Sequence, residues 1–340
     1  MQTLKNEFLQ VLSFGDPEKV VELEHQDLDI NDLDDNAMVV EMIYAGIHPA
    51  DILSIEGHYG NAKFNTEHWT PSGLGLEGVG KVIFAGKKAK FKKDQIIVPF
   101  FGTGEVGSWS KYVVVKDGMD LPKDLDMKMA AHLFVNPFSI VGMFAELEKV
   151  GSCENKWLVI TAANSTLSRM AIRYGKERKA KIIGIVRKSE IVQNVEEEGC
   201  DFVLCTTKDN IDKRIMDVTE GKGADLALDA VGGELANHVI NSMAIKGQVI
   251  CYGLLSGLKM SLNMQKVLFR QVYIQGFNLL VWLTENQDLT KIKQTVINEM
   301  ESKTFDSKVE AVYDIHDYKK ALHHQAHSDH ARTGKLLFSF

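Results

Sequence analysis

The chain has 340 residues, 45% of them hydrophobic, which is enough for two domains that each bury a core. Its formal net charge of -7 argues against a nucleic-acid partner, because phosphate contacts need a basic surface. No stretch reaches the roughly 18 apolar residues of a membrane span, and Met1–Ser13 lacks the basic start and apolar run of a secretion signal. We therefore expect a cytoplasmic protein that does not contact a membrane.

The first part of the chain, to about residue 122, consists of short apolar runs separated by glycine-bearing turns. Short runs rich in valine, isoleucine and aromatic residues are typical of β-strands. This part predicts an all-β domain, with strands at Met38–Ala45, Gly78–Phe84, Gln95–Pro99 and Ser110–Val115.

The middle part alternates apolar runs with helical stretches, a pattern that indicates βαβ units on a parallel sheet. The expected helices are Ser168–Glu177, Ser189–Glu198 and Ile211–Thr219. The expected strands are Trp157–Thr161, Lys181–Val186, Asp201–Cys205, Ala224–Ala230, Gln248–Tyr252 and Val272–Phe277.

The tail predicts a helix near Thr290–Met300 and a strand near Glu310–Tyr313. Its last apolar run, Gly334–Phe340, has no partner strand nearby in the sequence. We therefore expect this last strand to return to the first domain.

The turn after the first strand of the middle part reads ITAANSTLSRMAI, from Ile160 to Ile172. In a doubly wound sheet this is where the free N–H groups at a helix start bind pyrophosphate. The usual GxGxxG motif is absent, but the residues are small, Asn164 tolerates a left-handed backbone, and Ser165 and Thr166 offer hydroxyl groups. A dinucleotide site and an ordinary polar turn both remain open.

The end of the second strand of the middle part bears on the identity of the cofactor. An NAD site usually carries an acidic residue there, which binds the ribose 2′-hydroxyl. Here Val186 is followed by Arg187 and Lys188, and a guanidinium group matches a 2′-phosphate. The pair favours NADPH, with two solvated surface charges as the alternative.

Several motifs together resemble the medium-chain dehydrogenase/reductase superfamily. They are Ala45–Gly60, Gly73–Val82, Asn136–Ile140, Ile160–Ile172, Ile185–Glu190, Leu226–Gly233 and Cys251–Leu255. Their order and spacing match over essentially the whole chain. The resemblance implies an α/β protein with a GroES-like β domain and a Rossmann domain built on a doubly wound parallel sheet.

The alcohol dehydrogenases of that superfamily place a zinc-binding cysteine near position 48 and a zinc-binding histidine near position 76. This chain has His48 and Leu76 there, and it lacks the structural cysteines that follow the position of Pro99. It therefore resembles the zinc-free branch, for which we expect no metal and a reduction by hydride delivery with a separate proton donor.

Within that branch the chain resembles the trans-2-enoyl-thioester reductases. Their motif NPxDxxxIxGxY is met by Pro49, Asp51, Ile55, Gly57 and Tyr59. The resemblance places Tyr59 beside the nicotinamide, where its hydroxyl would stabilise the charge that hydride addition puts on a carbonyl oxygen. A tyrosine packed at the turn is the alternative. His48 replaces the asparagine of the motif, and it is either a substrate contact or a structural histidine.

The implied activity is an NADPH-dependent transfer of hydride to a carbonyl-activated C=C in an enoyl thioester or enone. NADPH:quinone oxidoreductases share the scaffold and the NPxD motif, so a quinone is the alternative acceptor. A third hypothesis is an NADPH-binding regulatory protein without turnover, which the glycine-free turn favours. In each case the ligand is a small molecule, and a homodimer through the Val272–Phe277 edge is expected by resemblance.

The resemblance also assigns domains and cofactor contacts. It implies a catalytic domain from residues 1–126 and 279–340, and an NADPH-binding domain from residues 127–278. The implied cofactor contacts are Asn136, Asn164, Ser165, Thr166, Leu167, Arg187, Lys188, Tyr252, Gly253, Leu254, Leu255, Phe277, Asn278, Leu279 and Lys335.

Three histidines near the end of the chain, His323, His327 and His330, fall at helical spacing. Such a group could hold zinc or nickel. We expect the helix to end near Ser328, and no carboxylate or cysteine completes an obvious cage. A surface helix without metal is therefore the favoured interpretation.

Overall fold

The computed structural model describes residues 3–58, 73–101, 107–122, 124–286, 289–327 and 334–340. The chain divides into two compact units, and each is described by itself. The first comprises Met1–Val135 and Ser307–Phe340, and the second comprises Asn136–Asp306.

The first unit is built on a mixed sheet with the strand order β14-β15-β3-β4-β5-β7, in which β6 also pairs with β3. Its strands are β3 (Met38–Ile47), β4 (Gly78–Ala85), β5 (Ile96–Phe100), β6 (Tyr112–Val115), β7 (Asp117–Asp120), β14 (Val309–Asp314) and β15 (Lys335–Ser339). The strands predicted from the apolar runs are confirmed to within a few residues.

The last strand, β15, lies antiparallel to β3, with Leu336 opposite Ile47 and Ser339 opposite Tyr44. The prediction that it returns to the first unit is confirmed. The buried ring of Phe338 packs edge-on against Trp109 at a centroid distance of 5.1 Å. Both ends of the chain therefore contribute to one hydrophobic core.

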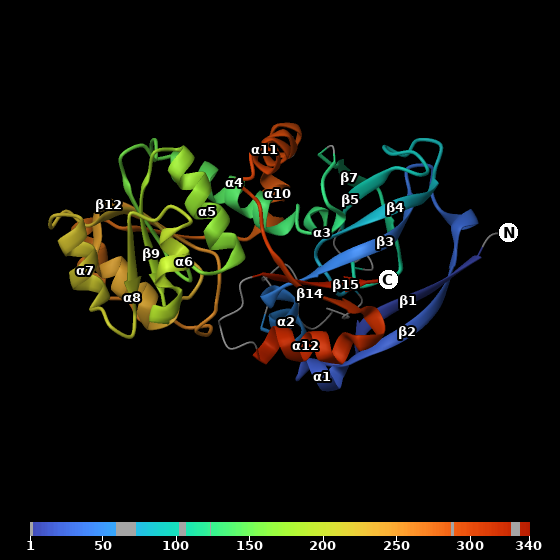
Figure 1. Ribbon diagram of the computed structural model, residues 1–340, viewed down its shortest axis with the longest axis horizontal. Helices are drawn as coiled ribbons and strands as arrows, with labels where there is room; N and C mark the ends of the chain where they lie inside the picture. The colour runs from blue at the N-terminus through green and yellow to red at the C-terminus, as the bar shows by residue number, and fades with distance from the viewer. Residues whose placement is uncertain (1–2, 59–72, 102–106, 123, 287–288, 328–333) are drawn as a thin grey trace. The chain divides into compact units, whose positions relative to one another are not determined.

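The first unit also contains helices, so the expectation of an all-β domain was too simple. A ribbon of β1 (Thr3–Val11) and β2 (Val21–Asp29) is connected through α1 (Pro17–Val20). The helix α12 (Tyr318–His327) packs against α1 and α2 (Pro49–Ile55), as Figure 1 shows. The described residues of the unit also form the short helices η1 (Ile30–Asp32), α3 (Met127–Ala130) and η3 (Ile315–Asp317).

The second unit contains a sheet whose strand pairs are all parallel, in the order β10-β9-β8-β11-β12-β13. Numbered within the unit, this is the order 3-2-1-4-5-6 of a Rossmann fold. Its strands are β8 (Trp157–Ile160), β9 (Lys181–Val186), β10 (Phe202–Cys205), β11 (Ala224–Asp229), β12 (Met243–Cys251) and β13 (Tyr273–Gly276). The predicted doubly wound parallel sheet is confirmed.

Helices precede, connect and follow the strands of the second unit. They are α4 (Val135–Glu148), α5 (Thr166–Glu177), η2 (Ser189–Ile191), α6 (Val192–Glu196), α7 (Ile211–Val218), α8 (Gly233–Asn241), α9 (Met264–Arg270), α10 (Leu279–Glu285) and α11 (Thr290–Glu301). Their apolar faces cover a core that includes Val159, Ile183 and Val239.

The two compact units are divided after residues 135 and 306, whereas the resemblance implied domain boundaries after residues 126 and 278. The segment after β13 stays in the second unit, because the indole Nε1 of Trp282 on α10 donates to Glu146 Oε1 on α4 at 3.0 Å. The ring of Phe305 also packs against Tyr174 on α5 at 5.2 Å.

None of the helices in the described residues is both long enough and apolar enough to cross a membrane.

Candidate functional site

The predicted phosphate turn lies between β8, in the interior of the parallel sheet, and α5. Ser165 caps α5, and its Oγ accepts a hydrogen bond from the N–H of Ser168 at 3.2 Å. The N–H groups of Thr166 and Leu167 open the helix and have no acceptor within it, so they are available to an anion. The left-handed residue of the turn is Ala162, with φ of 45°, and not Asn164 as expected.

Arg169, which the sequence did not single out, holds this turn in place. Its Nη2 donates to Asn164 Oδ1 at 2.6 Å, and its Nε donates to the Asn164 carbonyl at 3.1 Å. Glu198 accepts from the Nη1 of the same guanidinium at 3.2 Å. The Asn164 side chain is therefore committed to bracing the turn, which keeps its backbone in one conformation without glycine.

The end of the neighbouring strand β11 is tied to the same turn. Thr161 Oγ1 donates to the buried Asp229 Oδ1 at 2.7 Å, and accepts from the N–H of Ala230 at 2.9 Å. Asp229 Oδ2 in turn accepts from the N–H of Gly232, whose φ is 72°. The strand order reverses between β8 and β11, which is where doubly wound sheets bind their ligands.

The segment after β12 passes close to that point. The hydroxyl groups of Tyr252 and Ser168 are 3.2 Å apart, and desolvation raises the pKa of the Tyr252 phenol above its usual value. Gly253 is required by close approach, because a Cβ there would lie 2.4 Å from the Ala230 carbonyl oxygen. The structure thus brings Tyr252 and Gly253 to the turn, followed by the exposed Leu254 and Leu255.

Arg187 directly follows β9, the strand beside β8, and its side chain is exposed. Within the described parts of the chain, no hydrogen bond or ion pair of the Arg187 guanidinium is found, whereas Arg169 and Arg173 both pair with Glu198. Lys188 is partly buried and has interactions of its own. Arg187 is therefore the cation of this pair that is open to a ligand.

The remaining predicted contacts of the second unit lie on α4 and at the start of α10. Asn136 is buried in the first turn of α4. Asn278 caps α10, where its Oδ1 accepts from the N–H of Val281 at 3.1 Å, and Leu279 begins the helix. Phe277 packs so closely on α4 that a Cβ at Gly142 would lie 2.7 Å from its ring.

In the first unit, His48 and Lys335 belong to a buried charged cluster that the sequence did not reveal. Lys335 Nζ lies 3.1 Å from both ring nitrogens of His48 and 3.7 Å from Glu77 Oε1. Glu77 also accepts from the His48 ring, and the N–H groups of Phe134 and Val135 donate to its other oxygen at 3.2 and 2.6 Å. Glu77 is fully buried, and it is the counter-ion of the cluster.

The titration of the cluster follows from these contacts. Burial alone would raise the pKa of Glu77, but the charges of His48 and Lys335 hold it well below its usual value. Burial lowers the pKa of His132, whose ring lies 3.7 Å from Glu77, to about 4. Burial raises the pKa of Asp51 to about 7, although the His48 N–H opposes the shift. We conclude that Glu77 is the ionised carboxylate at neutral pH.

Asp51 explains part of the motif that begins at His48. Pro49 occupies the first turn of α2, and Asp51 accepts from the backbone N–H of His48 at 2.7 Å. Proline at the start of a helix and a carboxylate that reaches back to the N-cap both favour helix initiation. Tyr59, the predicted proton donor of the same motif, lies outside the described residues.

The cluster does not suit a catalytic zinc ion of the alcohol dehydrogenase type. Leu76 offers no ligand atom, and the ammonium group of Lys335 lies against both nitrogens of His48. A zinc site needs uncharged imidazole nitrogens or anions that point at a common centre. His48 is therefore a partner of Glu77 and Lys335.

Two family models match the chain. The model described as alcohol dehydrogenase GroES-like domain matches residues 34–124, and the model described as zinc-binding dehydrogenase matches residues 167–322. A mitochondrial enoyl-[acyl-carrier-protein] reductase of Dictyostelium discoideum is 25% identical over 339 residues, which covers 95% of this chain and 92% of that protein. Its human counterpart is 26% identical over 280 residues, which covers 79% and 71%.

Solved structures share the fold. The quinone oxidoreductase of Escherichia coli in complex with NADPH has a TM-score of 0.82 and 21% identity, and covers 98% of this chain and 100% of its own. The mitochondrial 2-enoyl thioester reductase heterodimer of Candida tropicalis has a TM-score of 0.82 and 20% identity, with 99% and 100% covered. The chain belongs to the medium-chain dehydrogenase/reductase superfamily, and it is similar to the enoyl and quinone reductases within it.

Proposed function

We propose that this protein binds NADPH and uses it to reduce a C=C bond that is activated by a carbonyl group, in an enoyl thioester or an enone. The observation that carries the proposal is the dinucleotide turn between β8 and α5, with the uncommitted Arg187 at the end of the adjacent strand. The similarity to enoyl-[acyl-carrier-protein] reductases supports the choice of acceptor.

The chain's own groups suit such a cofactor. The N–H groups of Thr166 and Leu167, together with the positive end of α5, would hold the pyrophosphate. Arg187 would pair with the 2′-phosphate, because a guanidinium group forms two parallel hydrogen bonds with phosphate oxygens. The segments that include Asn136, Tyr252–Leu255, Phe277–Leu279 and Lys335 are proposed as its further contacts.

When bound, NADPH would supply the hydride that the β-carbon of the acceptor takes up. The chain's own part would be to stabilise the negative charge that develops on the carbonyl oxygen and to let a proton reach the α-carbon. Tyr59 remains the proposed group that stabilises the oxygen or delivers the proton, because a phenolic O–H can do both. His48, buried between Glu77 and Lys335, is proposed to position these charges.

A quinone is the second candidate acceptor, which the similarity in fold to the Escherichia coli quinone oxidoreductase favours. One assay distinguishes the two classes of acceptor: it follows NADPH absorbance with crotonyl thioester, a simple enone and 1,4-naphthoquinone. We expect turnover with the thioester or enone to exceed that with the quinone. The reverse order would assign a quinone reductase, and tight NADPH binding without turnover on any acceptor would favour a regulatory protein.

A homodimer through β13 forms part of the proposal. The edge strand and the helix before it expose large apolar side chains, with Phe269 78% and Tyr273 54% exposed. Exposed apolar edges of this kind tend to be covered by a partner. Sedimentation of the wild type and of Phe269→Ser tests this: we expect a dimeric wild type and a weakened dimer in the variant. A monomeric wild type, or a variant that dimerises as tightly as the wild type, would contradict it.

The cytoplasmic location also stays a proposal, because the enoyl reductases compared above are named as mitochondrial. Fractionation of cells that express the full chain would decide between the two compartments.

A further inference from the structure

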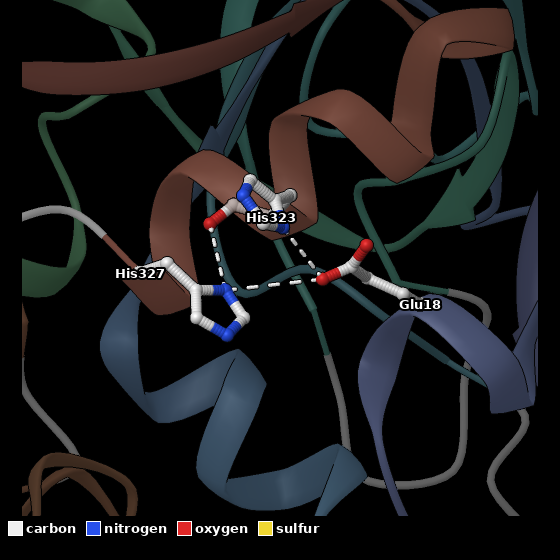
Figure 2. A group of neighbouring side chains, drawn as sticks. All are labelled: Glu18, His323 and His327. Atoms are coloured by element: carbon white, nitrogen blue, oxygen red, sulfur yellow. Dashed lines mark hydrogen bonds and ion pairs between the residues drawn. The ribbon is translucent and has the colours of Figure 1, made fainter.

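Two of the three histidines near the chain end meet a carboxylate from the other end of the sequence. His323 and His327 lie one turn apart on α12, and Figure 2 shows them beside Glu18 of α1. The sequence offered no carboxylate for this group because Glu18 is 305 positions from His323. His330 lies outside the described residues.

The three side chains already have donor atoms near one centre. Glu18 Oε1 lies 2.8 Å from His323 Nδ1 and 3.8 Å from His327 Nδ1. One donor atom from each residue lies within 4.8 Å of the others. Ligands of one tetrahedral zinc ion are about 3.3 Å apart, given bonds of about 2.0 Å. Small side-chain rotations therefore suffice to bring all three onto one ion.

The two rings are arranged for chelation by one helix face. They stack with a centroid distance of 4.5 Å, and their side chains are 61% and 60% exposed. Histidines at i and i+4 on a helix are a recurrent pair of zinc ligands. The long contact from His327 Nδ1 to the His323 carbonyl, at 3.3 Å, is a weak hydrogen bond that an ion would replace.

Two of the neighbouring cations have counter-ions, since Lys19 pairs with Asp16 at 2.8 Å and Lys320 pairs with Asp317 at 2.7 Å. A third, Lys319, lines the same hollow and lies over the Tyr318 ring, 5.8 Å from its centroid. His324, the other histidine of this helix turn, points elsewhere and meets the Tyr313 hydroxyl at 2.7 Å. Glu18 has only His323 and His327 as ion-pair partners within the described parts of the chain.

We propose that Glu18, His323 and His327 form a binding site for one divalent transition-metal ion of the zinc or nickel class. Imidazole nitrogen with one carboxylate oxygen suits these ions, and water completes the coordination sphere. The site is separate from the buried His48 cluster. The ion ties α1, near the start of the chain, to α12, near its end, and so stabilises the first unit.

The test uses tag-free full chain that has been treated with a chelator and titrated with Zn²⁺ and, separately, Ni²⁺ by calorimetry. We expect one site whose dissociation constant rises at least tenfold in His323→Gln and in His327→Gln, and less in Glu18→Gln. The matched control is His316→Gln, because the His316 side chain is also 61% exposed and pairs with the carboxylates of Asp314, at 2.6 Å, and Glu7, at 3.5 Å, rather than with Glu18. The control should bind like the wild type.

Two further readouts keep the test decisive if a variant folds poorly. Zn²⁺ should raise the melting temperature of the wild type and of His316→Gln but not of His323→Gln. X-ray absorption of the wild type loaded with one equivalent of Zn²⁺ should show two imidazole ligands. The proposal is overturned if the wild type binds neither metal, if His323→Gln binds as tightly as the control, or if the absorption spectrum shows oxygen ligands only.

Discussion

Glu77 offers the sharpest test of how the first unit is held together. The substitution Glu77→Gln keeps the size of the side chain and removes the charge that faces His48 and Lys335. The carboxylate is fully buried and accepts hydrogen bonds from the N–H groups of Phe134 and Val135. The amide can keep one of these bonds with its oxygen, but it removes the negative charge that lies 3.7 Å from the Lys335 ammonium group.

The size of the effect follows from the loss of that buried charge. Breaking a buried ion pair by removing one partner costs about 3–5 kcal/mol. For a unit of this size each kcal/mol moves the melting temperature by about 2–4 °C, so we expect a fall of about 6–20 °C. The double variant Glu77→Gln/Lys335→Met should be less destabilised than the sum of the two single variants, because the two groups compensate each other.

Calorimetry, with hydrogen exchange to assign the transition to the first unit, measures the change. The control is Asp94→Asn, which removes an exposed ion pair with Lys81 at 2.8 Å and keeps a residue that tolerates the φ of 73° at this position. We expect the control to cost less than about 1 kcal/mol. If Glu77→Gln were no more destabilising than Asp94→Asn, the buried cluster would not be the ionic pair described here.

Three further predictions concern pH, the cofactor and the proton donor. Because the pKa of His132 is lowered to about 4, its contribution to stability is present above its unfolded value of 6.5 and is lost as the pH falls toward 4. The pKa of Asp51 is raised to about 7, so Asp51 has the opposite effect: its contribution to stability is lost as the pH rises through 7. In His132→Asn only the effect of Asp51 remains of these two, so stability should decline from pH 4 to 7 more steeply than in the wild type. An unchanged slope of stability against pH, measured by denaturant titrations, would refute this. Arg187→Gln should weaken NADPH binding by about 10–100-fold, because it removes charge-assisted hydrogen bonds worth about 1.5–3 kcal/mol. NADH binding and the melting temperature should not change. Equal effects on both cofactors in fluorescence titrations would argue against a 2′-phosphate contact. Tyr59→Phe should lower kcat by about 100-fold or more with NADPH affinity retained, and stopped-flow rates equal to the wild type would remove Tyr59 from the reaction.

The parallel sheet could be predicted from the sequence because most of its strands contain a buried apolar run, such as Leu158–Ile160 and Ile182–Ile183. The strand Lys181–Val186 was predicted with the bounds that the structure has. The helix α4 was missed, because it is buried on nearly all sides and so lacks the apolar periodicity of an amphipathic helix. The ribbon of β1 and β2 was missed for the opposite reason, since many of its side chains are polar and only a few are buried.

The residues of the candidate site also fall into a group that could be predicted from the sequence and a group that could not. The phosphate turn and Arg187 are local in the sequence, so strand and helix patterns were enough to locate them. The cluster around Glu77 joins residues from positions 48 to 335, and the pairing of Glu18 with His323 spans nearly the whole chain. Contacts of that kind depend on how β15 and α12 pack on the first unit, and no local pattern encodes them. Arg169 was missed because an arginine inside a helix gives no sign that it turns back to Asn164.

The dinucleotide is proposed to be held by its pyrophosphate and its 2′-phosphate. The decisive measurement is a calorimetric titration of the wild-type full chain with NADPH and with NADH at one ionic strength. We expect one site per chain and a dissociation constant for NADPH at least about tenfold lower than that for NADH. Equal affinities for the two, or no binding of either, would contradict it.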